Sequence, residues 1–100
     1  MPEKVRMNYD TMREMTKEFK AAQQQLQETL KVVQNIGKDM DGGGLQGQAG
    51  QTMVGAINGP LTKSIKKLAD AMGELAKDTD DARRALEEGV KIAKNRFMNA

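Results

Sequence analysis

A glycine-rich stretch at residues 41–47 divides the chain into two long segments. Gly42, Gly43 and Gly44 are consecutive, and Gly47 follows closely. Glycine weakens a helix interior and readily adopts the positive φ angles of tight turns, so several glycines in succession interrupt a helix. A regular apolar stripe runs through the segment on each side of this stretch. The sequence therefore predicts a helical hairpin that bends here.

The segment before the bend has apolar residues at heptad spacing. Such a seven-residue repeat is typical of a helix that packs along another helix. The repeat predicts a helix over about residues 5–40. Its seam consists of Val5, Met12, Phe19, Leu26, Val33 and Met40, with Tyr9, Met15, Ala22, Leu30 and Ile36 three or four residues away.

The segment after the bend has apolar residues three or four apart, which predicts a second helix over about residues 48–97. Pro60 lies inside it, and an internal proline lacks an amide donor and clashes with the preceding turn. Two arrangements near residues 58–60 fit this pattern: a kink within one helix, or a new helix with Pro60 in its first turn. The stripe consists of Leu45, Ala49, Met53, Ile57, Leu61, Ile65, Leu68, Met72, Leu75, Thr79, Ala82, Leu86, Val90, Ala93 and Phe97.

Three isolated glycines, Gly55, Gly73 and Gly89, lie inside the second segment. Each weakens a helix by about 1 kcal/mol relative to alanine. They indicate either close approach of another helix, where a side chain would not fit, or positions where glycine is merely tolerated.

Composition limits how much core one hairpin can form. Only 38% of the 100 residues are hydrophobic, and a pair of helices covers its own apolar stripes only in part, so such a chain usually needs a partner. We therefore expect one all-α domain, residues 1–100, forming an antiparallel helix-turn-helix hairpin that dimerises into a four-helix bundle. The expected hairpin and dimer interface consists of Met12, Phe19, Leu26, Val33, Met53, Ile57, Leu61, Leu68, Met72, Leu75 and Leu86.

Charge and residue content argue against several function classes. The net charge is only +2, and both signs alternate along both segments, so no basic stripe for nucleic acid exists. The absence of Cys and His removes thiol nucleophiles, imidazole bases and the commonest transition-metal ligands. No apolar run approaches the roughly 20 residues of a membrane span, and the start lacks the apolar core of a signal peptide. Sparse aromatic residues and balanced charge also argue against membrane binding.

Two patterns imitate functional motifs and are better explained structurally. The bend contains the dinucleotide-binding spacing G-x-G-x-x-G, but a helical segment precedes it where that motif requires a strand. Asp78, Asp80 and Asp81 form an acidic cluster that fits a solvated helix face with basic partners such as Lys77 and Arg84. We therefore expect no catalytic residue, cofactor or metal ion.

The bend and its flanks also carry a family resemblance. Leu45-Gln46-Gly47 stands where a W-x-G turn motif belongs between two long amphipathic helices. In this layout the chain resembles the WXG-motif family, also called ESAT (early secreted antigenic target) proteins, over roughly Val5 to Phe97. Leu45 replaces the aromatic residue of the motif. The Y-x-x-x-D/E export signal that often follows the second helix cannot be placed, since the only tyrosine is Tyr9.

The resemblance implies a function in type VII (Esx) secretion. Family hairpins pair antiparallel as homodimers or heterodimers, and an export machine recognises the folded pair without any reaction. We therefore expect a non-enzymatic, virulence-associated substrate or component of type VII secretion, cytoplasmic before export and secreted by a route other than the general one. Its expected partners are a second copy or a related hairpin, and the secretion machinery. Two alternatives are an intracellular adaptor or export chaperone that holds a partner helix, and a membrane-active amphipathic hairpin.

Overall fold

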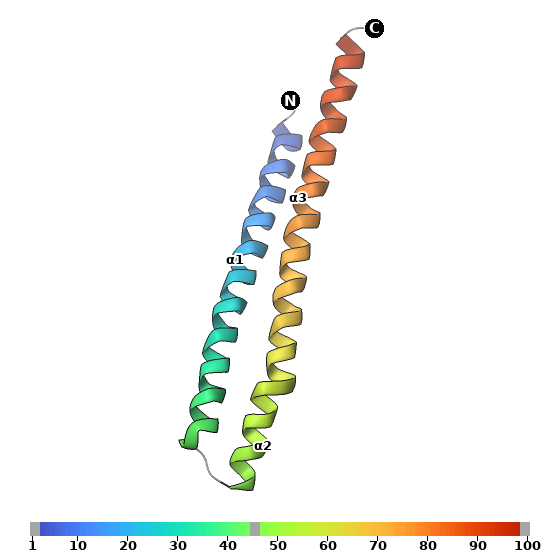
Figure 1. The fold of residues 1–100 in the computed structure, drawn as a ribbon. Coiled ribbons are helices and arrows are strands. Elements are labelled where there is room, and N and C mark those ends of the chain that lie inside the picture. The colour runs from blue at the N-terminus through green and yellow to red at the C-terminus, as the bar shows by residue number, and fades with distance from the viewer. Residues whose placement is uncertain (1–2, 45–46, 99–100) are drawn as a thin grey trace. The chain divides into compact units, whose positions relative to one another are not determined.

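The structure, a computed structural model, describes residues 3–44 and 47–98, and within these ranges every residue except Gly47 is helical. The described chain is therefore all-α, and its two long helical arms form the antiparallel hairpin that the sequence predicts (Figure 1). The first arm consists of α1, Glu3–Asp39, and a π-helical turn η1, Met40–Gly44. The second arm consists of α2, Gln48–Ala56, a π-helical turn η2, Ile57–Leu61, and α3, Thr62–Met98.

The chain forms two compact units, and each contains a stretch of both arms. Unit 1 comprises Met1–Lys20 and Gly73–Ala100, and unit 2 comprises Ala21–Met72. In unit 1 the first part of α1 packs on the later part of α3. In unit 2 the rest of α1 packs on the arm formed by α2, η2 and the start of α3. Each unit therefore has its own seam between antiparallel helices.

Tyr9 anchors the seam of unit 1. Its side chain is only 4% exposed, and its hydroxyl donates a hydrogen bond to the backbone oxygen of Leu86 at 3.2 Å. Thr16 and Ala76 are also buried. The Thr16 hydroxyl donates to the Met12 carbonyl oxygen at 3.0 Å, so this polar group is satisfied within its own helix. Small side chains with satisfied polar atoms thus let the two helices approach closely.

In unit 2 the two arms approach each other closely at Gly37. It is buried, and a Cβ atom at this position would overlap Oδ1 of Asn58 and lie 3.2 Å from Cγ2 of Ile57. Glycine leaves room for this approach because it has no side chain. Thr62 and Ala69 are the buried residues of the facing arm. The arms therefore pack through small residues in this unit too.

One contact indicates the antiparallel register of each unit: Tyr9 lies against Leu86 in unit 1, and Gly37 lies against Asn58 in unit 2. In unit 1 this register places the large side chain of Phe19 at the level of Ala76. In unit 2 it places Leu26 at the level of Ala69 and Val33 at the level of Thr62. All six residues of the predicted α1 seam are half-buried: Val5, Met12, Phe19, Leu26, Val33 and Met40.

The π-helical turn η2 accommodates Pro60 within a continuous helical path from α2 to α3. Two successive seam residues, Ile57 and Thr62, are five positions apart in the sequence. The reason is that a π-helical turn contains one residue more than an α-helical turn. The Thr62 hydroxyl donates to the Ile57 carbonyl oxygen at 2.7 Å. This bond satisfies the Ile57 carbonyl within the turn that contains Pro60. The second arm therefore does not start anew at Pro60.

The chain stays helical further into the glycine stretch than the sequence predicts. η1 carries helical backbone to Gly44. Among the described residues, the glycine with positive φ is Gly47, at 93°, directly before α2. Its carbonyl oxygen accepts a hydrogen bond from the amide of Gln51 at 3.1 Å, which starts the helix. Leu45 and Gln46, predicted as part of the turn, lie outside the described residues.

Candidate protein interaction surface

Three leucines at heptad spacing are exposed on the second arm. Leu61, Leu68 and Leu75 are 44%, 49% and 42% exposed. Successive helix residues point about 100° apart, so a residue next to a seam position flanks the seam and does not fill it. The residues that follow these leucines are the buried ones: Thr62, Ala69 and Ala76.

α1 presents exposed apolar residues at the equivalent positions. Met15 is 44% exposed and Ile36 is 46% exposed, and each directly precedes a buried seam residue. In an antiparallel helix pair, the residues that directly precede these seam positions lie on the same side of the seam. We call them the apolar sides of the two units: Met15 and Leu75 in unit 1, and Ile36, Leu61 and Leu68 in unit 2.

The opposite side of the seam in unit 1 carries a ladder of ion pairs. Arg13 joins the two arms, with its Nη2 atom 2.6 Å from Oε1 of Glu87. Arg83 contacts Glu87 at 2.8 Å and Asp80 at 2.9 Å, and Arg84 contacts Asp80 at 2.9 Å. The Arg83 side chain is only 13% exposed. This side of unit 1 is thus polar and internally paired, whereas the other side presents apolar groups.

The ladder changes the protonation equilibria of its central pair. The hydrogen bond from Arg83, together with the charges of Arg84, Arg83 and Lys20, holds the pKa of Asp80 below its ordinary value of 3.8, although burial acts in the opposite direction. The same hydrogen bond raises the pKa of Arg83. Both groups are therefore charged at neutral pH. One polar atom of the pair, Nε of Arg83, is buried without a hydrogen-bond partner.

The residues predicted for the hairpin and dimer interface fall into two groups. The half-buried ones lie along the seam: Met12, Phe19, Leu26, Val33, Ile57 and Met72. The exposed ones are Met53, Leu61, Leu68, Leu75 and Leu86. Sequence reasoning missed the buried residues with small or polar side chains. The signal that could have found them is the recurrence of small residues every seven positions: Thr62, Ala69 and Ala76.

The acidic cluster on α3 contributes to the ion-pair surface. Asp80 pairs with Arg83 and Arg84, whereas Asp78 and Asp81 are exposed. In residues 3–44 and 47–98, no group of three or more potential ligands could hold a metal ion. No helix in that part of the chain combines the length and apolarity needed to cross a membrane.

The long hairpin with its heptad seam is matched by a protein family. The model of the family described as WXG100, proteins of 100 residues with WXG, matches residues 4–90. The chain belongs to the WXG100 family. No curated protein and no solved structure matches it. In this WXG100 protein the matched range includes the seams, the apolar sides and the ion-pair ladder. The family assignment confirms the resemblance seen in the sequence and makes this a small helical-hairpin protein of the ESAT-like type VII secretion family.

Proposed function

We propose that this WXG100 protein is a substrate or component of type VII secretion and acts as a dimer of helical hairpins. Family membership supports the secretion role, because WXG100 proteins are small secreted helical proteins and not enzymes. The observation that carries the dimer is the heptad series of exposed leucines on α3 and η2. A dimer would cover these residues with the apolar side of a second copy or of a related hairpin.

Such pairing would contribute favourable free energy to association through burial of apolar side chains. Full burial of a Leu, Ile or Met side chain contributes about 1.5–3 kcal/mol. The five residues of the apolar sides are 42–49% exposed, so covering each one contributes about half of that amount. Two hairpins joined in this way would form a four-helix bundle, the arrangement in which long amphipathic helices cover their stripes.

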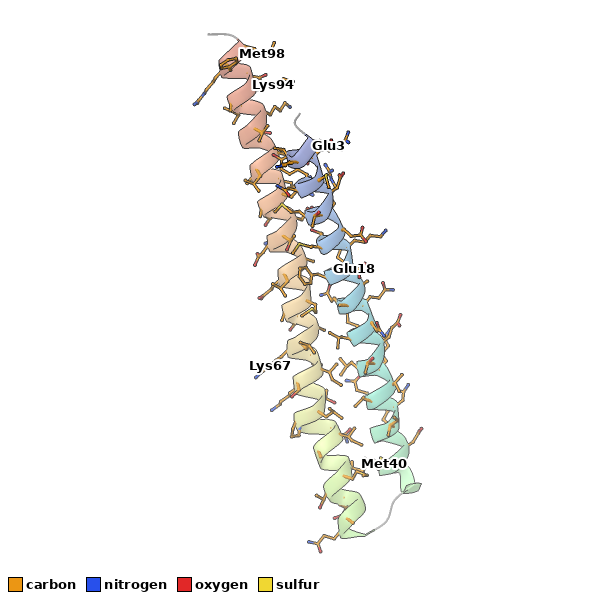
Figure 2. The ribbon with its side chains drawn as sticks, turned by 180° about the vertical axis from the view of Figure 1, so that it is seen from behind. Glu3, Glu18, Met40, Lys67, Lys94 and Met98 are labelled. Carbon is orange, nitrogen blue, oxygen red and sulfur yellow. The ribbon has the colours of Figure 1, made fainter. Side chains whose placement is uncertain are left out.

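The solution mass of the purified chain tests the dimer. Light scattering should give about 22 kDa, twice the 11.0 kDa of one chain. Leu68→Asp should lower the mass to that of one chain, because it places a charge in the dimer interface. Lys67→Asp is the matched control, since the Lys67 side chain points away from α1 (Figure 2).

Two outcomes would contradict the homodimer. A dimeric Leu68→Asp variant would exclude the apolar side as the interface. A monomeric wild-type chain would exclude self-pairing and favour a related hairpin or another protein's helix as the partner.

Export is tested in the native host. The protein should accumulate in the culture medium of cells with an intact type VII secretion ATPase and stay inside cells that lack it. A cytoplasmic protein released in parallel serves as the lysis control. Equal export by both strains would exclude the secretion role.

A further inference from the structure

We infer that unit 2 contains a binding site for a small phosphate-bearing anion, on the side of the seam opposite its apolar side. A hollow of about 560 Å³ opens there, within the size range of small-ligand pockets. Its walls come from both arms of the hairpin. The lining residues are Lys31, Gln34, Asn35, Lys38, Asn58 and Thr62.

The α1 wall of the hollow is one helix face. Lys31, Gln34, Asn35 and Lys38 are spaced by three, four and seven residues from the first, which brings them to one side of the helix. Ile36, on the apolar side of this unit, is two residues from Gln34 and therefore points in nearly the opposite direction. A dimer formed through the apolar side would leave this hollow open.

The hollow exists because the seam is narrow and polar at this level. Gly37 has no side chain, and Asn58 stands opposite it where a large apolar residue would fill a typical seam. Thr62 is buried, and its hydroxyl is occupied as a donor to the Ile57 carbonyl. Close helix approach at Gly37 and a polar lining therefore occur together.

The charge of the lining favours an anion. It contains two lysines and no carboxylate. Within the described part of the chain, no carboxylate lies within 4.0 Å of the ammonium group of Lys31 or Lys38. The two lysines are about 10 Å apart along the helix axis, and their long side chains can converge on one ligand between them.

The donors in the lining suit phosphate in particular. The side-chain amides of Gln34, Asn35 and Asn58 make no hydrogen bond to the described residues, so their N–H groups are available to phosphate oxygens. No aromatic side chain lines the hollow for stacking on a nucleobase. The site therefore recognises the phosphate group itself, whether in a free anion or in a lipid headgroup.

Titration with inorganic pyrophosphate at constant ionic strength tests the site. We expect saturable NMR shifts of the side-chain amides of Gln34, Asn35 and Asn58. The double variant Lys31→Gln with Lys38→Gln should weaken binding by about tenfold or more, because it removes both cations. The control pair, Lys67→Gln with Lys77→Gln, removes the same charge from exposed positions outside the hollow and should change affinity by less than a factor of two. Circular dichroism checks that both variants stay helical.

A non-saturable response, or equal weakening by both double variants, would overturn the proposal. Vesicles of phosphatidylcholine with and without phosphatidic acid identify the source of the phosphate. Binding of pyrophosphate alone indicates a soluble ligand, and additional retention by phosphatidic acid vesicles that depends on Lys31 and Lys38 indicates a lipid headgroup. The monomeric Leu68→Asp variant should still bind pyrophosphate, so failure of the dimer and failure of this site are distinguishable.

Discussion

Gly37 sets the distance between the two arms in unit 2. Alanine is a better helix former than glycine by about 1 kcal/mol, so a glycine in mid-helix is retained at a cost. Here a Cβ atom would collide with Asn58, and the close approach of the arms depends on its absence. The sequence indicates close approach at Gly55, Gly73 or Gly89 instead, yet a Cβ atom on Gly55 or Gly89 would meet nothing within 4 Å. Glycine content alone could not tell which glycine faces another helix, because that depends on the register.

Alanine substitutions separate these two kinds of glycine. Gly55→Ala should stabilise the protein by about 1 kcal/mol through helix propensity alone. Gly37→Ala should gain nothing or lose stability, since the clash with Asn58 and Ile57 offsets that gain. Urea unfolding at one fixed chain concentration measures both. Equal stabilisation by the two substitutions would show that the helices do not meet at Gly37.

Asp80 gives the ion-pair ladder a defined pH dependence. Its pKa is lower in the folded than in the unfolded chain, so the pairing stabilises the fold above the ordinary value of 3.8 and is lost as pH falls through the lowered value. Asp80→Asn should be less stable than wild type at about pH 6, and the difference should shrink at pH below 3.8. Thermal unfolding by circular dichroism at stepwise lower pH measures this. Asp78→Asn, at an exposed position outside the ladder, is the control, and an identical pH profile for the two variants would exclude the assigned role.

At the level of helices, the two arms differ in how well their seam residues can be predicted from the sequence. The α1 seam is predictable from sequence because Phe19, Leu26 and Val33 are large, apolar and seven residues apart. The facing seam of α3 is built from small residues that fit between these side chains, and hydrophobicity does not identify them. The stripe chosen from the sequence therefore includes Leu61, Leu68 and Leu75, each displaced by one residue from the buried position. The half-buried position of Arg83 was equally unpredictable, since its environment depends on Asp80 and Glu87.

Enlarging a small seam residue tests this assignment of α3. Ala69 is 4% exposed at the level of Leu26, so Ala69→Leu should overpack the seam and lower stability by about 1–3 kcal/mol. Ala85→Leu adds the same atoms at an exposed position of the same helix and should change stability by no more than about 0.5 kcal/mol. Urea unfolding compares the two, and a tolerated Ala69→Leu would place the seam elsewhere on α3.

At the level of the whole molecule, the family match and the packing end at the same place. The matched range stops at residue 90, and every described residue beyond it, from Lys91 to Met98, is exposed. In unit 1 the end of α3, with Lys94 and Met98, extends past Glu3, the first residue of α1 (Figure 2). These last turns therefore contribute little to the packing of the hairpin.

Shortened chains test that division. A chain ending at Val90 should melt within about 4 °C of wild type, since no buried contact is removed. A chain ending at Ala82 should melt lower by more than about 8 °C, because Tyr9 loses its contact with Leu86 and the ladder loses Arg83 and Glu87. Thermal unfolding monitored by circular dichroism distinguishes them. A large loss from the Val90 chain would show that the exposed end supports the fold.

The apolar side of each unit lies on one side of its seam only, and this affects the symmetry with which copies of the chain can pair. When two copies of a chain pair through the same surface about a two-fold axis, that surface is buried on both molecules. The other side offers ion pairs in unit 1 and a polar hollow in unit 2, neither of which attracts a third copy. A homodimer formed as proposed would therefore be a closed particle, with neither apolar side left to add a third copy.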